Sequence, residues 1–233
     1  MSILRHHDPE IETLWRSLSK SEVRSIAVVS AEPGEGATTL AAALARRAAL
    51  SGQRTLLVDL NLHRPGVMAL LKLPPAPGTS KIMAGGLNFR EHDGFGVLAD
   101  IGLAETDRWR EPARLQEQLL LWQQDWDFIV LDTAAVLYRG HDTIPALAVA
   151  QSADATLMVA MAGRTTATRV REAREKLQAC GARLIGAVLN DRDNPPLNVE
   201  LEREMGRLSR FLPGLANKIG GRLRRSPLVR VRI

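Results

Sequence analysis

A glycine-rich loop is the first stretch of this sequence whose residues could do chemistry. Residues 31–39 follow an apolar run and precede an alanine-rich stretch. In the order strand, glycine loop, helix, glycines let backbone N–H groups turn toward a phosphate, and the helix N-terminus adds partial positive charge. The order therefore predicts a phosphate-binding loop. Its predicted nucleotide-binding residues are Pro33, Gly34, Glu35, Gly36, Ala37, Thr38 and Thr39.

The loop lacks the cation that usually completes it. In the usual pattern a lysine follows the last glycine and contacts the β- and γ-phosphates, and the next hydroxyl binds magnesium. Here Ala37 occupies the lysine position and Thr38 the hydroxyl position. Losing the lysine removes a charge-assisted contact of about 1.5 to 3 kcal/mol. We therefore expect ATP or ADP, with magnesium, to bind with low affinity. The alternative is a glycine turn that only packs a helix against a strand.

Short apolar runs rich in Val, Ile and Leu separate the helix-like segments. They occupy residues 25–30, 55–60, 128–131, 155–161 and 183–189. Such uninterrupted runs are typical of strands covered on both faces, so the sequence predicts the α/β class, with a mostly parallel sheet flanked by helices on both faces. Helices are predicted at 38–51, 111–124, 144–151 and 166–180. The Pro- and Gly-rich segment 73–102 is predicted to be a connection with one short helix and one short strand.

Composition excludes several classes of protein. The chain has 233 residues, 45% of them hydrophobic and 24% charged, which is typical of a globular protein. Its one cysteine and the absence of a Cys/His cluster exclude a disulfide scaffold and a structural zinc module, and favour a reducing cytoplasm. No apolar run approaches the roughly 18 residues needed to span a bilayer. We expect neither a classical secretion signal nor an integral membrane protein.

Charge is divided unevenly along the chain. The net charge is +5, but residues 205–233 hold eight Lys or Arg and no Asp or Glu, which leaves −3 for residues 1–204. We expect an N-terminal helical segment at 1–22, a P-loop ATPase-like domain at 23–204 and a basic tail at 205–233. The tail can form an amphipathic helix on an anionic membrane, dock onto an export protein, or remain solvated.

Five motifs together carry a family resemblance: residues 33–36, 56–65, 128–133, 163–166 and 186–190. With them, residues 25–191 resemble the bacterial tyrosine kinases (BY-kinases) of capsule and exopolysaccharide synthesis. That family lies within the deviant P-loop group that includes chromosome-partitioning and division-site ATPases. The resemblance implies a three-layer P-loop NTPase sandwich. It also implies Thr38, Asp59 and Asp132 as magnesium ligands, with Asp59 and Asp132 as catalytic residues. Asn190 either contacts the nucleotide base, as in the family, or caps a turn.

The departures from this family fall on the chemistry. The family's second motif has two aspartates, and here the second is Asn61, whose amide can neither take a proton nor supply charge to a metal. Alanines replace the two prolines that usually follow the third motif. The family's C-terminal tyrosine cluster is missing, since Tyr138 is the one tyrosine of the chain. We therefore expect Asp59 and Asp132 to be vestigial or weak as catalytic residues.

Four further residues near these motifs have simpler interpretations. His63 stands where an arginine is common and is interpreted as an exposed loop histidine. Asp142 and Thr143 are interpreted as N-cap residues of the helix predicted at 144–151. Arg64 is the nearest candidate to replace the missing lysine.

These observations favour a regulatory, pseudokinase-like protein of exopolysaccharide or capsule biosynthesis or export. It would bind a membrane polysaccharide co-polymerase or related export protein, with nucleotide binding weak or lost, in the cytoplasm or at the inner face of the cytoplasmic membrane. One alternative is a slow ATPase or tyrosine kinase that retains its magnesium ligands, and another is a membrane- or DNA-associated positioning ATPase. A homo- or hetero-oligomer fits all three. Nucleic acid is the less favoured partner, because no interleaving of aromatic and basic residues is present.

Overall fold

The computed structural model describes residues 8–73, 80–82, 87–99 and 101–192. By its internal contacts the chain divides into two compact units, Met1–Asn190 and Asp191–Ile233. Only Asp191 and Arg192 of the second unit are among the described residues. The predicted basic tail at 205–233 lies outside them.

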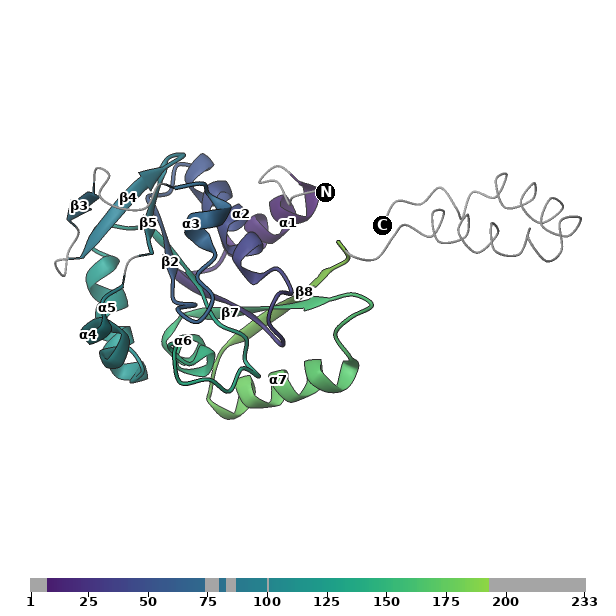
Figure 1. Ribbon diagram of the computed structural model, residues 1–233. Coiled ribbons are helices and arrows are strands. Elements are labelled where there is room, and N and C mark those ends of the chain that lie inside the picture. Colours follow the sequence, from purple (N-terminus) through teal and green to yellow (C-terminus); the bar gives the residue numbers. More distant parts are fainter. Residues whose placement is uncertain (1–7, 74–79, 83–86, 100, 193–233) are drawn as a thin grey trace, which may run out of the picture. The chain divides into compact units, whose positions relative to one another are not determined.

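The centre of the first unit is an eight-stranded sheet (Figure 1). Its strands are β1 (Ser25–Ser30), β2 (Thr55–Asp59), β3 (Ser80–Ile82), β4 (Asn88–His92), β5 (Phe95–Leu98), β6 (Phe128–Asp132), β7 (Ala155–Met161) and β8 (Leu184–Asn190). The strand order is β3-β4-β5-β2-β6-β1-β7-β8. The six strands from β5 to β8 in this order are parallel, whereas β3 and β4 are antiparallel to their neighbours. The predicted mostly parallel sheet is confirmed.

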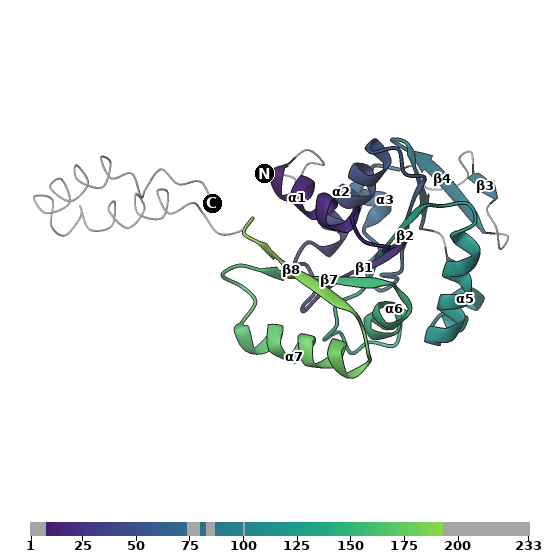
Figure 2. The ribbon, with the colours of Figure 1, turned by 180° about the vertical axis from the view of Figure 1, so that it is seen from behind.

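Helices cover both faces of the sheet (Figures 1 and 2). One face packs against α1 (Pro9–Leu18), α2 (Ala37–Leu50) and α3 (Val67–Leu70). The other face packs against α4 (Leu103–Arg108), α5 (Pro112–Trp122), α6 (Ala146–Ser152) and α7 (Ala167–Ala179). The three-layer α/β sandwich predicted from the sequence is therefore confirmed.

Burial on both faces explains the uninterrupted apolar strands. Ile26 and Val28 of β1 pack into the core under α1 and α2, and Ala27 and Val29 pack into the core on the other face. All four side chains are fully buried. A polar residue at any of these positions would lose its hydration without gaining a partner, so the sequence has no polar alternation here.

Helix α1 packs directly onto the sheet domain. Its Trp15 and Leu18 are buried, and the Trp15 ring meets Phe128 edge to face at 5.3 Å. Glu12 on the same helix pairs with Arg47 of α2 at 2.6 Å. Hydrogen bonds from the Arg47 and Arg16 guanidinium groups lower the pKa of Glu12 to about 2. Within the N-terminal helical segment predicted at 1–22, the structure has α1 over Pro9–Leu18, which faces α2.

The segment 73–102 departs from its prediction. Its described residues contain three strands, β3, β4 and β5, and no helix. Asp93 and Gly94 both have positive φ, 47° and 84°, which is the backbone that a tight hairpin between β4 and β5 requires. Phe95 and Val97 of β5 are buried, so this short strand packs into the core. The Asp-Gly pair was the signal for this hairpin, and the many prolines and glycines around it obscured it.

No helix within the described part of the chain is long and apolar enough to cross a membrane.

Candidate functional site

The glycine loop connects β1 to α2 at the carboxyl edge of the sheet. Helix α2 begins at Ala37, so the predicted loop residues do precede and open a helix. Gly34 and Gly36 have φ values of 83° and 102°, which residues other than glycine rarely adopt. A Cβ on Gly36 would also lie 2.5 Å from Nδ2 of Asn190. Both glycines are therefore required by the backbone.

Glu35 fixes the shape of the loop from within. Its side chain is 1% exposed, and Oε2 accepts hydrogen bonds from the backbone N–H groups of Ala31 at 2.9 Å and Glu32 at 3.1 Å. Its other carboxylate oxygen accepts a hydrogen bond from the hydroxyl of Thr165, in the turn after β7. The loop is thus held both by its own side chain and by a neighbouring strand.

The side chain of Asn190, at the end of β8, contacts the glycine loop. Its Nδ2 donates to the backbone carbonyl oxygen of Glu35 at 2.8 Å. The structure therefore brings Asn190 together with the predicted nucleotide-binding residues, although it is 155 positions away from Glu35 in sequence. A base contact by Asn190 stays a prediction.

The lysine position holds a small buried residue. Ala37 is 7% exposed and packs in the core between α2 and the sheet. Next to it, Thr38 lies in the first turn of α2, close to Gly66, where a Cβ would meet Cγ2 of Thr38 at 3.2 Å. The loop therefore has a hydroxyl at its predicted place and no cation from its own sequence.

Asp59 and Asp132 end the neighbouring strands β2 and β6 as register partners. Both oxygens of Asp59 accept backbone hydrogen bonds, Oδ1 from Asn61 at 3.1 Å and Oδ2 from Gly66 and Val67 at 3.1 Å each. Burial raises the pKa of Asp59, and these three N–H groups oppose the increase. Asp59 therefore shapes the turn that leads into α3.

Asp132 has the opposite environment. It is fully buried, and neither of its oxygens has a hydrogen-bond partner of good geometry among the described residues. Burial and the nearby charge of Asp59 raise the pKa of Asp132 well above its usual value, and the adjacent Thr38 hydroxyl offsets part of the increase. A buried carboxylate without a partner costs several kcal/mol in its charged form. The side chain is therefore suited to a cationic ligand.

The residues at this edge fit a hydrated magnesium ion. No three His, Cys, Asp or Glu side chains converge on a metal position within the described ranges. A nucleotide-bound magnesium ion instead keeps several waters and takes one or two carboxylates and phosphate oxygens. Asp132 and Thr38 offer such oxygens, and Asp59 lies beside them. When bound, the ion would neutralise charge on the phosphates.

A second polar cluster joins the turns after β2 and β6. His63 Nδ1 lies 2.7 Å from Asp142 Oδ2 and 2.7 Å from the Tyr138 hydroxyl, which donates to Asp142 Oδ1 at 2.7 Å. The rings of His63 and Tyr138 stack at 4.2 Å. The bond to Asp142 raises the pKa of Tyr138 to about 12, and the bonds from Tyr138 and His63 lower the pKa of Asp142 to about 2. His63 is exposed as predicted, but it also takes part in this cluster.

Asp142 and Thr143 do not cap the following helix. Helix α6 begins at Ala146, with Pro145 in the N-cap position. Thr143 instead donates to the carbonyl oxygen of Leu60 at 3.2 Å and accepts from the N–H of Leu62 at 3.1 Å. Both side chains instead bond to residues of the turn after β2. Only the three-dimensional proximity of the two turns shows this.

Arg164 is a site residue that the motif analysis did not single out. It lies in the turn between β7 and α7, and its Nη2 approaches the carbonyl oxygen of Pro33 at 3.5 Å. A Cβ on Gly34 would lie 3.7 Å from its Nη1. The sequence signal was the run of residues 163–166, which the family resemblance included without a role for the arginine.

Comparison with solved structures identifies the class of the fold. The kinase domain of Escherichia coli tyrosine kinase ETK matches with a TM-score of 0.59 and 23% identity, over 77% of this chain and 71% of that chain. A ParA family ATPase from Chlorobium tepidum matches with a TM-score of 0.51 and 19% identity, over 80% and 82%. At these identities the likeness shows the fold, which is that of the P-loop NTPases.

Comparison with curated proteins then identifies the relatives. The succinoglycan biosynthesis transport protein ExoP of Rhizobium meliloti is 29% identical over 198 residues, which are 76% of this chain and 23% of ExoP. Tyrosine-protein kinase CpsD of Streptococcus pneumoniae is 24% identical over 184 residues, 76% of this chain and 79% of CpsD. No protein-family model matches the chain. Tyrosine-protein kinases of the BY-kinase family are among both the curated relatives and the structural neighbours, so the predicted resemblance to that family is confirmed.

Proposed function

We propose that this protein is a regulatory, pseudokinase-like relative of the BY-kinases in exopolysaccharide or capsule biosynthesis. It retains the phosphate loop but transfers no phosphoryl group. It acts by binding a membrane polysaccharide co-polymerase or related export protein at the inner face of the cytoplasmic membrane. Bound nucleotide, held weakly, would change the conformation of the loop and of the turns beside it.

The observation that carries this proposal is Ala37 at the lysine position. Its methyl group is buried in the core, so the start of α2 offers backbone N–H groups and no charge to a phosphate. Phosphoryl transfer depends on cations placed where charge develops, and loss of one such donor costs roughly 10²- to 10³-fold in rate.

Two further features support the proposal. Asp59, the first aspartate of the second motif, has both oxygens engaged by backbone N–H groups, and the second aspartate of that motif is Asn61. The chain has a single tyrosine, Tyr138, whose hydroxyl is bonded to Asp142. The general base, the loop cation and the tyrosine substrate of the family are therefore each altered in this chain.

Turnover tests the loss of chemistry. Purified protein is assayed for magnesium-dependent ATP hydrolysis and for tyrosine phosphorylation, beside an Ala37→Lys variant. We expect no turnover by the wild type, and tighter ATP binding by the variant because the lysine contact is restored. Magnesium-dependent hydrolysis by the wild type that is lost on Asp132→Asn would contradict the proposal.

Capture of a partner tests the regulatory part. The cytoplasmic segment of a membrane polysaccharide co-polymerase from the same organism is used to retain this protein in a pull-down, with and without ADP. We expect retention of the wild type and of the Asp132→Asn variant alike, because binding requires no turnover. Failure of both proteins to bind would overturn the proposed partner.

A slow ATPase is the second candidate, and one observation favours it. Asp132 remains buried and without a partner next to Thr38, which is the environment a magnesium ion would complete. The turnover assay above separates the two functions. In this case Asp132→Asn abolishes hydrolysis, whereas an exposed substitution such as Asp107→Asn does not.

A further inference from the structure

Both acidic side chains of the glycine loop have partners among the described residues. Glu32 of the loop forms an ion pair with Arg169 at 2.6 Å, and Arg169 also contacts Glu172 at 3.0 Å. Glu35 is bonded to backbone N–H groups and to Thr165. Both loop carboxylates are therefore neutralised or occupied, which lowers the repulsion that they would exert on a phosphate.

Arg164 lies beside the loop and, in the residues that the structure describes, has no ionic partner of this kind. Within the described part of the chain, no carboxylate forms an ion pair with it, and its guanidinium lies against the backbone of the loop at Pro33 and Gly34. Its Nη2 donates to the carbonyl oxygen of Pro33 at the long distance of 3.5 Å. The donors of this guanidinium are thus largely available.

The turn that carries Arg164 is itself fixed to the loop. Gly163 has φ of 71°, and the N–H groups of Arg164 and Thr165 both donate to the carbonyl oxygen of Met161, at 3.3 and 2.9 Å. The Thr165 hydroxyl then bonds Glu35 of the glycine loop. Because residue 165 is tied to the loop, the backbone of residue 164 is held at a position from which its guanidinium reaches Gly34.

We propose that Arg164 supplies, from the turn after β7, the phosphate-binding cation that Ala37 no longer supplies from α2. Its ligand class is a nucleoside diphosphate or triphosphate whose phosphates occupy the loop N–H groups. A guanidinium presents a planar fork of donors that binds phosphate oxygens in pairs, and its long side chain can turn from Pro33 toward such an anion. This inference rests on the proposed retention of nucleotide binding.

The position of the charge has a functional consequence. A loop lysine on α2 approaches the β- and γ-phosphates, where it also assists transfer. An arginine on the turn after β7 approaches from the side of Gly34 and Asn190 instead. Such a cation can hold a nucleotide without restoring the lysine contact at the transferred group, which agrees with a protein that senses nucleotide and does not turn it over.

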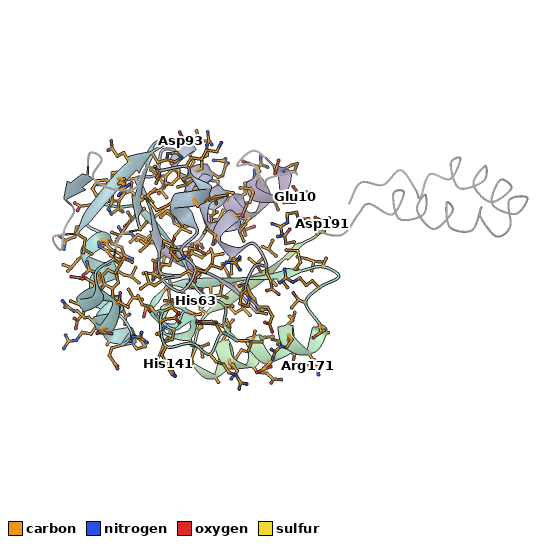
Figure 3. All side chains as sticks on the ribbon, in the orientation of Figure 1. Glu10, His63, Asp93, His141, Arg171 and Asp191 are labelled. Atoms are coloured by element: carbon orange, nitrogen blue, oxygen red, sulfur yellow. The ribbon has the colours of Figure 1, made fainter. Side chains whose placement is uncertain are left out.

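Calorimetric titration with ADP, pyrophosphate and adenosine tests the assignment. The proteins are the wild-type chain and its variants Arg164→Gln and Arg171→Gln. Arg171 is the matched control, an arginine on the side of α7 that faces away from the sheet (Figure 3). We expect Arg164→Gln to weaken ADP and pyrophosphate by at least about tenfold, or about 1.4 kcal/mol, and Arg171→Gln to leave both unchanged. Adenosine binding should be equal in all three proteins, because adenosine carries no phosphate.

Several results would overturn the assignment. Equal ADP affinity in the wild type and Arg164→Gln, or an adenosine affinity that falls as much as that of ADP, would show that Arg164 holds no phosphate. Absence of ADP binding by the wild type at millimolar concentration, with binding by Ala37→Lys, would do the same. The proposed function fails separately, by turnover in the wild type or by failure to retain the partner, and neither result depends on Arg164.

Discussion

The turns that follow β2 and β6 start from the same residue type at the same height in the sheet. Asp59 and Asp132 are register partners at the ends of these strands, and both are fully buried. Asp59 accepts three backbone hydrogen bonds, whereas Asp132 accepts none of good geometry from the described residues.

This difference separates a structural aspartate from one that is left for a ligand. The turn after β2 curls back on Asp59, because the N–H groups of Gly66 and Val67 point at its carboxylate. The turn after β6 leads away from Asp132, and its polar side chains reach across to the β2 turn instead. We therefore expect that replacing these two aspartates, which look equivalent in the motifs, changes the free energy of unfolding in opposite directions.

The largest expected effect is on the structural aspartate. Asp59→Ala removes the acceptor of three N–H groups and should lower the free energy of unfolding by about 3 kcal/mol, since each buried donor left unpaired is costly. Urea denaturation measures this. Asp59→Asn keeps one acceptor oxygen and should lose less. Equal stability of Asp59→Ala and wild type would show that the three bonds do not hold the turn.

Asp132→Asn should have the opposite sign. Removing a buried charge that lacks a partner should raise the free energy of unfolding at neutral pH by about 1 kcal/mol without nucleotide. The pKa of Asp132 is raised in the folded protein, so its contribution favours folding most at low pH and is lost as pH rises from the unfolded pKa through the folded one.

The pH dependence gives the control for this variant. Wild-type stability should decline over that interval, and Asp132→Asn should lose most of the decline while the smaller contribution of Asp59 remains. Denaturation at a series of pH values above 4 compares them. An identical pH profile for both proteins would contradict the raised pKa of Asp132.

The bridge between the two turns should have a smaller effect. Thr143→Val removes the hydroxyl that joins Leu60 and Leu62 to the β6 turn, and we expect a loss of about 1 kcal/mol because both backbone groups lose a partner. Thr143→Ser keeps the hydroxyl and serves as the control. If valine and serine are equally stable in urea, the bridge contributes nothing.

The smallest expected effect is a change in the pKa of Tyr138, which absorbance measures without overlap because the chain has a single tyrosine. Phenolate absorbance should report a pKa of about 12 for Tyr138 in the wild type. Asp142→Asn should move it toward the usual value near 10, since the charged acceptor is gone. Asp107→Asn, at an exposed position of α4, should leave it unchanged. A wild-type value near 10 would show that the cluster does not form.

The sequence determined the fold and most of the loop because those signals are local. Apolar runs such as 155–161 are buried on both faces, and a strand of that composition has few other stable positions. The glycines at 34 and 36 mark a backbone that only glycine adopts easily. Asp59 and Asp132 end neighbouring parallel strands and so lie at one edge of the sheet, but nothing local in the motifs distinguishes their environments.

The tertiary structure alone decided which residues meet. Arg164, Asn190 and the glycine loop are far apart along the chain and come together because β1, β7 and β8 are neighbouring parallel strands whose carboxyl ends share an edge. The contacts of His63 with the β6 turn arise in the same way from β2 and β6. The spacing of residues in the sequence does not predict such contacts, because they depend on the order of the strands in the sheet. Packing of the whole core determines that order.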